Sequence, residues 1–186
     1  KTVAATFTSG GTVTFQEGVS SYVGTVDTHI RLLGPTTSYG TSATLEWDSE
    51  DGSAGQASSK YALLRFDNIF GSGTGQIPVG STITSATLQY VVSNLTANSP
   101  SNVNEVLVDW TEATTYSTFG SIAGVQAEDY GTLVTTAPGT LAQTYPIDVI
   151  SSLSTWSGNP TSNRGWIIRP AGTDGVQIAS SDNTTV

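Results

Sequence analysis

The chain has 186 residues, no cysteine, a net charge of −9 and only 11% charged residues. A chain of this length is expected to fold as one domain with a substantial core. The absence of cysteine excludes disulfides. The six lysine and arginine residues are too few for a basic patch, so we expect no nucleic-acid partner. No apolar stretch is long enough for a transmembrane helix, and we therefore expect no membrane insertion.

Methionine is also absent, and the sequence starts at Lys1. This start favours a mature chain from which a signal peptide has been removed. A surface hydrated by Ser, Thr, Gly and Asn is common in secreted proteins. We therefore expect an extracellular or cell-surface location.

Apolar and polar residues alternate along most of the chain, which is typical of strands with one buried face. The alternating segments, in chain order, are 2–8, 43–47, 61–67, 86–92, 105–110, 140–147, 165–169 and 176–179. Gly, Ser, Asn and Pro cluster between them, as they do in turns. One short helix is expected over 149–157, capped by Asp148 and stopped by Gly158. This pattern predicts an all-β protein, an antiparallel β-sandwich of the jelly-roll type.

Several phrases of the sequence match a known family in the same order. They are residues 61–67 (YALLRFD), 77–88 (IPVGSTITSATL), 108–115 (VDWTEATT), 162–168 (SNRGWII) and 178–181 (IASS). With them the chain resembles the DNRLRE-type β-sandwich domain, which is related to carbohydrate-binding module family 96. The resemblance implies an extracellular jelly-roll module without enzyme activity, often attached to polysaccharide-degrading or surface proteins.

The chain departs from this family at both ends. Family domains continue after the IASS phrase into a final strand, whereas this sequence stops at Val186. Residues 1–11 form an additional strand-like extension and joint ahead of the sandwich, which we assign to residues 12–186. Within the extension, Val3, Ala5 and Phe7 alternate with threonines, as an assembly strand donated to a neighbouring subunit would require. The equally favoured alternative is that residues 2–8 fold back onto their own subunit, or that the sequence is simply cut short.

The aromatic residues divide into core and surface candidates. Strand alternation places Phe66, Trp47, Trp110 and Trp166 in the core, and the apolar stripe of the expected helix places Trp156 there. Sugar-binding proteins stack pyranose rings on exposed aromatics, so tyrosines in loops are the better glycan platforms. The candidates are Tyr22, Tyr39, Tyr116 and Tyr130.

Acidic residues cluster in one loop between predicted strands. Asp48, Glu50 and Asp51 lie there, and carboxylates with backbone carbonyls are the ligands that calcium prefers. A structural calcium is therefore the candidate cofactor, and a solvated acidic loop is the equally favoured alternative. Arg65 and Asp67, two residues apart on one strand face, are expected to form an ion pair.

Catalytic motifs are missing from the sequence. It contains one histidine, His29, and no nucleophile elbow, zinc-protease motif or phosphate loop, so we expect no enzyme activity. Asn94 and Asn183 each begin a glycosylation pattern.

These sequence features support two candidate functions. The first is a structural subunit that assembles with itself, head to tail, into a surface filament by donating its N-terminal strand. The second is a carbohydrate-binding module that recognises a polysaccharide.

Overall fold

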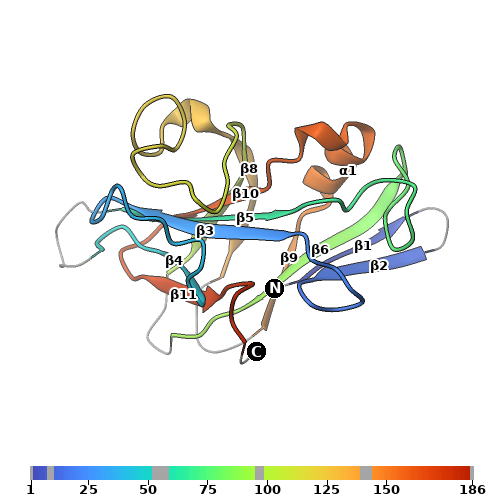
Figure 1. The fold of residues 1–186 in the computed structure, drawn as a ribbon, viewed down its shortest axis with the longest axis horizontal. Helices are drawn as coiled ribbons and strands as arrows, with labels where there is room; N and C mark the ends of the chain where they lie inside the picture. Colours follow the sequence, from blue (N-terminus) through green and yellow to red (C-terminus); the bar gives the residue numbers. More distant parts are fainter. Residues whose placement is uncertain (1, 8–10, 52–58, 95–98, 139–143, 185–186) are drawn as a thin grey trace.

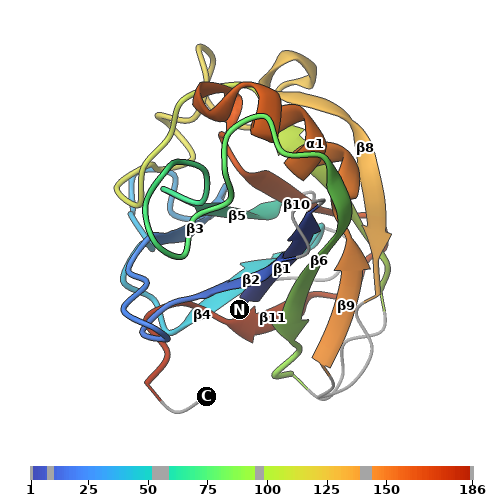
Figure 2. The same cartoon turned by 90° about the vertical axis from the view of Figure 1, so that its right-hand side faces the viewer.

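Two antiparallel β-sheets pack face to face, as Figures 1 and 2 show for a computed structural model that describes residues 2–7, 11–51, 59–94, 99–138 and 144–184. In spatial order, the first sheet contains β2 (Gly11–Gln16), β1 (Thr2–Phe7), β6 (Ile83–Val91) and β9 (Thr144–Asp148). The second contains β3 (Thr25–Arg31), β5 (Lys60–Phe66), β10 (Trp166–Pro170), β7 (Ser101–Val106) and β8 (Tyr130–Ala137). A third, small sheet pairs β11 (Val176–Ala179) with β4 (Thr44–Trp47). The predicted all-β antiparallel sandwich is confirmed, whereas the jelly-roll connection stays a prediction.

The helix α1 (Ile150–Gly158) covers one end of the sandwich (Figure 2). It starts one residue after the predicted position, and the Asp148 carboxylate accepts a hydrogen bond from the Ile150 amide (2.9 Å). Two short 3₁₀ helices, Ala127–Asp129 and Pro160–Ser162, complete the helical segments in the described part of the chain. None of these helices is long and apolar enough to span a bilayer.

Aromatic residues fill the space between the two sheets. Phe66 on β5 packs edge-on against Trp166 on β10, and Trp166 lies against Trp156 of α1 with a ring-centroid distance of 4.9 Å. Trp47 is also fully buried here and makes a side-chain hydrogen bond to Ser101. The core positions predicted for Phe66 and for these three tryptophans are confirmed.

Trp110 is buried as predicted, but in a second cluster on the outer face of the second sheet. There it packs with Ile30, Leu63 and Ile167 beneath the segment 107–129. The Arg65 guanidinium lies over the Trp110 ring, 5.0 Å from the ring centroid. Arg65 also forms the predicted ion pair with Asp67. The strand predicted over 105–110 ends at Val106, so Trp110 owes its burial to the covering loop and not to strand alternation.

Both aromatic clusters should contribute strongly to stability. We expect Phe66→Ala and Trp110→Ala each to lower the free energy of unfolding by about 3–5 kcal/mol, because each leaves a large cavity. Leu133, which is 54% exposed on β8, is the matched control, and Leu133→Ala should change stability by less than about 0.5 kcal/mol. Urea unfolding of the three variants checks this. A Trp110→Ala variant as stable as the control would show that the second cluster adds nothing.

Candidate functional site

The N-terminal strand β1 lies inside the first sheet, between β2 and β6. All six of its residues pair with β2, from Thr2 opposite Gln16 to Phe7 opposite Gly11. The same six pair with β6 on the other side. In this single chain the predicted assembly strand therefore completes its own sheet.

The predicted inward positions of β1 pair with core residues. Val3 lies opposite Phe15 and Leu88, which are both buried. Ala5 lies opposite Ala86, which is also buried. The inward role of Val3, Ala5 and Phe7 in an exchanged strand stays a prediction.

A β-bulge fixes how β1 meets β6. The register shifts between Thr6, which pairs with Ser85, and Phe7, which pairs with Ile83, so Thr84 of β6 has no opposite residue. A bulge of this kind is tied to one register, because a strand that slips by two residues no longer matches it. The slot between β2 and β6 therefore accepts one alignment of this strand.

A cluster of charged side chains lies at the other end of the sandwich, where β3, β4 and β5 meet. Lys60 begins β5, and its ammonium lies 2.5 Å from the Glu46 carboxylate on β4 and 3.3 Å from Asp51. Arg31, at the end of β3, lies 2.8 Å from Asp51 through Nε and donates a second bond through Nη2 (3.0 Å). The side chains of Lys60 and Asp51 are only 9% and 7% exposed. We call these four residues the ionic cluster.

The backbone holds the ionic cluster in place. Lys60 exchanges two backbone hydrogen bonds with Asp48 and lies opposite Arg31 in the β3–β5 register. Burial alone would raise the pKa of Glu46, but hydrogen bonds from Lys60 and Gln177 outweigh it and lower that pKa to about 2. Glu46 therefore stays ionised beside the Lys60 ammonium at neutral pH.

The acidic loop predicted to bind calcium overlaps this cluster. The Asp51 carboxylate is shared by Arg31 and Lys60, and Asp48 accepts a hydrogen bond from the Glu50 amide (2.9 Å). Within the described residues, no three carboxylate or histidine side chains are grouped so that they could hold a metal ion. Calcium binding by Asp48, Glu50 or Asp51 stays a prediction.

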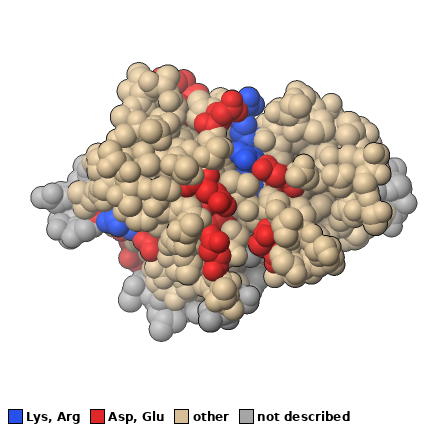
Figure 3. Space-filling view, in the orientation of Figure 1, with Lys and Arg blue, Asp and Glu red and all other residues tan. Residues whose placement is uncertain are grey.

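Other acidic residues form a band across one face of the molecule. Figure 3 shows this band down the centre of the view, while the lobe to its right carries no charge colour on the described residues. Burial, followed by repulsion from Asp182, Asp27 and Glu17, raises the pKa of Glu112. On this face, the acidic side chains of the described residues gather in the band, and the neighbouring lobe is uncharged.

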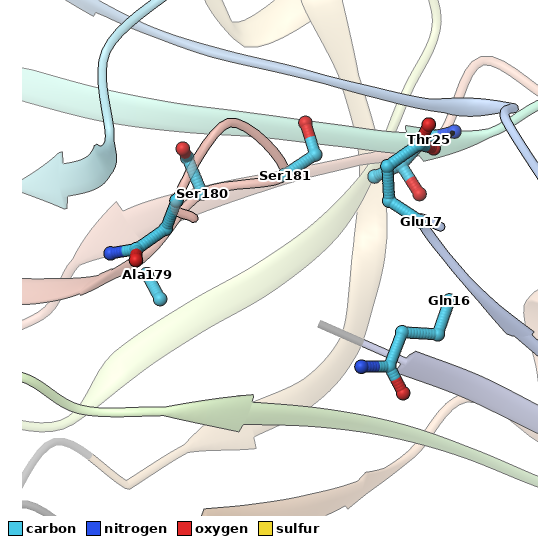
Figure 4. A pocket seen from close by; sticks show the side chains of 7 residues that line it. Gln16, Glu17, Thr25, Ala179, Ser180 and Ser181 are labelled. Atoms are coloured by element: carbon cyan, nitrogen blue, oxygen red, sulfur yellow. Dashed lines mark hydrogen bonds between the residues drawn. The ribbon is translucent and has the colours of Figure 1, made fainter. Parts of the chain in front are cut away.

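A small pocket lies at one end of this region, between the start of β3 and the residues after β11 (Figure 4). The Glu17 carboxylate accepts a hydrogen bond from the Thr25 amide (3.0 Å), and Asp27 accepts one from the Ser181 amide (2.9 Å). A volume of about 50 Å³ suits water but not a sugar ring. The hydrogen bond from Ser181 to Asp27 at this pocket joins the C-terminal segment to β3 of the sandwich.

The predicted glycan platforms are all half-buried, and each is held by a neighbour. Tyr22 packs on Phe15, and its hydroxyl donates to the Asp67 carbonyl (2.8 Å). Tyr39 stacks on His29, with 4.3 Å between ring centroids. Tyr130 carries Arg169 over its ring, and Tyr116 packs into the second cluster. The structure brings none of them together into one aromatic strip.

Tyr22 alone lines a sizeable groove. It runs along the outer edge of β2, has a volume of about 620 Å³ and is walled by the 19–24 loop, Asn68 and residues 74–76. No lining residue is charged. Ser20, Ser21 and Asn68 adopt positive φ angles, and no other described non-glycine residue does. Sequence alternation cannot reveal this groove, because it forms where three separate segments meet.

The predicted glycosylation residues have different surroundings. The Asn94 amide accepts a bond from the Gln177 backbone (2.7 Å) and donates to the Gly175 carbonyl (2.9 Å). Asn183 donates to the Ala43 carbonyl (3.2 Å) in the terminal turn. Use of either acceptor stays a prediction.

Comparison with known proteins adds no relative. No protein-family model matches the chain, and no curated protein matches it significantly. The family resemblance seen in the sequence phrases therefore stays an expectation.

His29 makes the fold sensitive to acid. Burial lowers its pKa to about 4, despite the nearby Glu46 carboxylate. The unfolded chain, with an ordinary histidine pKa of about 6.5, binds the proton more readily, so stability is complete above that pH and falls as the pH drops. We expect a loss of about 1–2 kcal/mol between roughly pH 6.5 and 5.

Thermal melts across that pH window measure the effect. Because the chain contains one histidine, His29→Gln should flatten the slope. An unchanged slope in the variant would assign the acid sensitivity to other groups.

Proposed function

We propose that the chain is a non-catalytic structural subunit that assembles head to tail by exchanging β1 with a neighbouring copy. The observation that carries the proposal is the position of β1, which is first in the sequence yet inner in its sheet. An inner strand is hydrogen-bonded on both sides, so the sheet needs it. β1 directly precedes β2 in the β1–β2 hairpin, and another copy can supply the same strand to the position between β2 and β6.

The exchanged contact would be the one already described within the single chain. β1 of one copy would enter between β2 and β6 of the next, opposite Phe15, Ala86 and Leu88. Exchange of an identical element conserves these contacts, so it is a low-cost route to assembly. When each copy donates to the next, the contact does not close on itself and a filament results.

The composition of β1 suits this role. Its sequence, TVAATF, contains no charge, so transfer between two copies that each carry −9 brings no charged side chain into the sheet. At about 3.3 Å per residue, six residues span roughly 20 Å, a normal strand length. Secretion to the cell surface would fit an assembly role and belongs to the same proposal.

Single-cysteine variants test the exchange. Thr6 lies opposite Ser85, so a disulfide between these positions reports that β1 occupies the slot beside β6. We expect an equimolar mixture of Thr6→Cys and Ser85→Cys chains, oxidised at high concentration, to form covalent dimers containing one chain of each kind. The chain's own lack of cysteine removes background pairs.

Two controls complete the experiment. Thr6→Cys mixed with Leu133→Cys, an exposed position on β8, should give few dimers. The double variant Thr6→Cys/Ser85→Cys, kept dilute, should close within one chain. If the double variant forms its intramolecular disulfide but the mixture gives no dimers above the control, β1 remains in its own chain and the proposal fails.

Carbohydrate binding is the second candidate, and the uncharged groove beside β2 supports it. Hydroxyl and amide groups from Thr12, Thr14 and Gln76 line the groove together with the half-buried Tyr22. A neutral polysaccharide would find hydrogen-bond partners there without meeting the protein's negative charge.

A charge placed in the groove tests this candidate. Val23 lines the groove and is 81% exposed, so Val23→Asp should weaken binding of a neutral polysaccharide roughly tenfold, or about 1.4 kcal/mol. Leu133→Asp adds the same charge outside the groove and should leave binding unchanged. Affinity electrophoresis in gels containing neutral polysaccharides measures both, and equal retardation of the two variants would reject the groove.

A further inference from the structure

The ionic cluster contains the groups needed for an amide cross-link between two side chains. We propose that Lys60 and Asp51 condense spontaneously to form an intramolecular isopeptide bond, with Glu46 as the proton carrier and Arg31 as the anion-stabilising group. The inference is independent of strand exchange and rests on the distances in this cluster alone.

The nucleophile and the acyl group are already close together. The Lys60 Nζ atom lies 3.3 Å from the Asp51 Oδ1 atom, so the nitrogen lies beside the carboxyl group that it would attack. The two backbone hydrogen bonds between Lys60 and Asp48 fix the start of the lysine side chain. Both reacting side chains are almost completely buried, which limits the water available to reverse the reaction.

Glu46 is placed to move the proton. Its Oε2 atom lies 2.5 Å from Lys60 Nζ, closer than Asp51, and its Oε1 atom accepts hydrogen bonds from Gln177 (2.8 Å) and Thr44 (3.2 Å). These bonds orient the carboxylate towards the ammonium. Glu46 is therefore the carboxylate nearest to the proton that Lys60 must lose before its nitrogen can attack.

Arg31 distinguishes Asp51 from Glu46 as the acyl group. Its guanidinium contacts both oxygens of Asp51, at 3.0 Å and 2.8 Å. A guanidinium in this position stabilises the negative oxygen that develops when an amine attacks the carboxyl carbon. Arg31 would therefore favour attack at Asp51.

The reaction balances without any further reagent. The amine nitrogen of Lys60 attacks Asp51 Cγ, a C–N bond forms and one C–O bond breaks. The departing oxygen leaves as water with two protons, one returned by Glu46 and one from the lysine nitrogen. Overall, the ammonium loses two protons, the carboxylate loses one oxygen, and nothing is oxidised or reduced.

The product replaces two buried charges by a neutral amide. The Lys60 and Asp51 charges disappear, while Arg31 and Glu46, whose side chains are each 25% exposed, stay charged. The bond also joins the chain across residues 52–59, a constraint that a chain without cysteine cannot obtain from a disulfide.

Intact-mass spectrometry of the folded full chain is the test. We expect a mass lower than the sequence mass by one water molecule. A tryptic digest should contain a branched peptide in which Asp51 is joined to an uncleaved Lys60. Lys60→Arg keeps the positive charge but cannot form the amide, so it should show the full sequence mass and a lower melting temperature. Lys1→Arg removes the chain's other lysine and should still lose water.

A succinimide at Asp51-Gly52 would also lose one water, and the variants separate the two products. The succinimide would persist in Lys60→Arg and would be cleaved by hydroxylamine, whereas the isopeptide bond would show neither behaviour. Asp51→Asn provides an independent check, because it should release ammonia and reach the same final mass as the parent product. Glu46→Gln should slow or abolish condensation while the fold, followed by circular dichroism, is retained.

The proposal is overturned if the parent chain retains its full mass after prolonged incubation. It is equally overturned if the lost water persists in Lys60→Arg. A branched peptide that joins Lys60 to Glu46 would overturn the assigned roles of the two carboxylates.

Discussion

The first sheet is continuous only because β1 supplies backbone hydrogen-bonding groups to strands on both of its sides. Buried N–H and C=O groups must be paired, and β2 and β6 have no contact in the sheet order except through β1. The rest of the sandwich depends on this, since β6 connects the sheet to β9 and its Ala86 carbonyl accepts a hydrogen bond from the Val149 amide just ahead of α1. The continuity of the first sheet thus depends on β1.

The sequence predicts much of the fold because alternation survives wherever a strand has one buried face. Segments 61–67, 165–169 and 176–179 became β5, β10 and β11 within a residue or so of the expected bounds. β8 was missed, because its exposed Leu133 and half-buried neighbours show no clean two-residue period. The strand prediction for the segment after Val106 is wrong, because a loop over the outer face of the second sheet, not a strand, buries Trp110 and half-buries Val108.

The candidate sites are formed by residues that are distant in sequence, and the alternation of apolar and polar residues does not predict which of them are in contact. The sequence shows the acidic cluster at residues 48–51, but the cations that reach Asp51 come from the end of β3 and the start of β5. Likewise, Tyr22 looked like an isolated loop tyrosine, and only the approach of Phe15 and the Asp67 carbonyl shows that it is anchored. No local signal in the sequence could have paired Lys60 with Asp51 and Glu46, because their proximity depends on the register of two strand pairs.

The short connection between β1 and β2 has a mechanical consequence. Phe7 and Gly11 lie opposite each other at the end of the hairpin, and only residues 8–10 separate them in sequence. Four Cα–Cα steps can span at most about 14 Å, even when fully extended. In an exchanged assembly, neighbouring sandwiches would therefore be in direct contact with almost no slack between them. Tension along such a filament would load the backbone hydrogen bonds of β1 in shear, many at once, and would not peel them apart one by one.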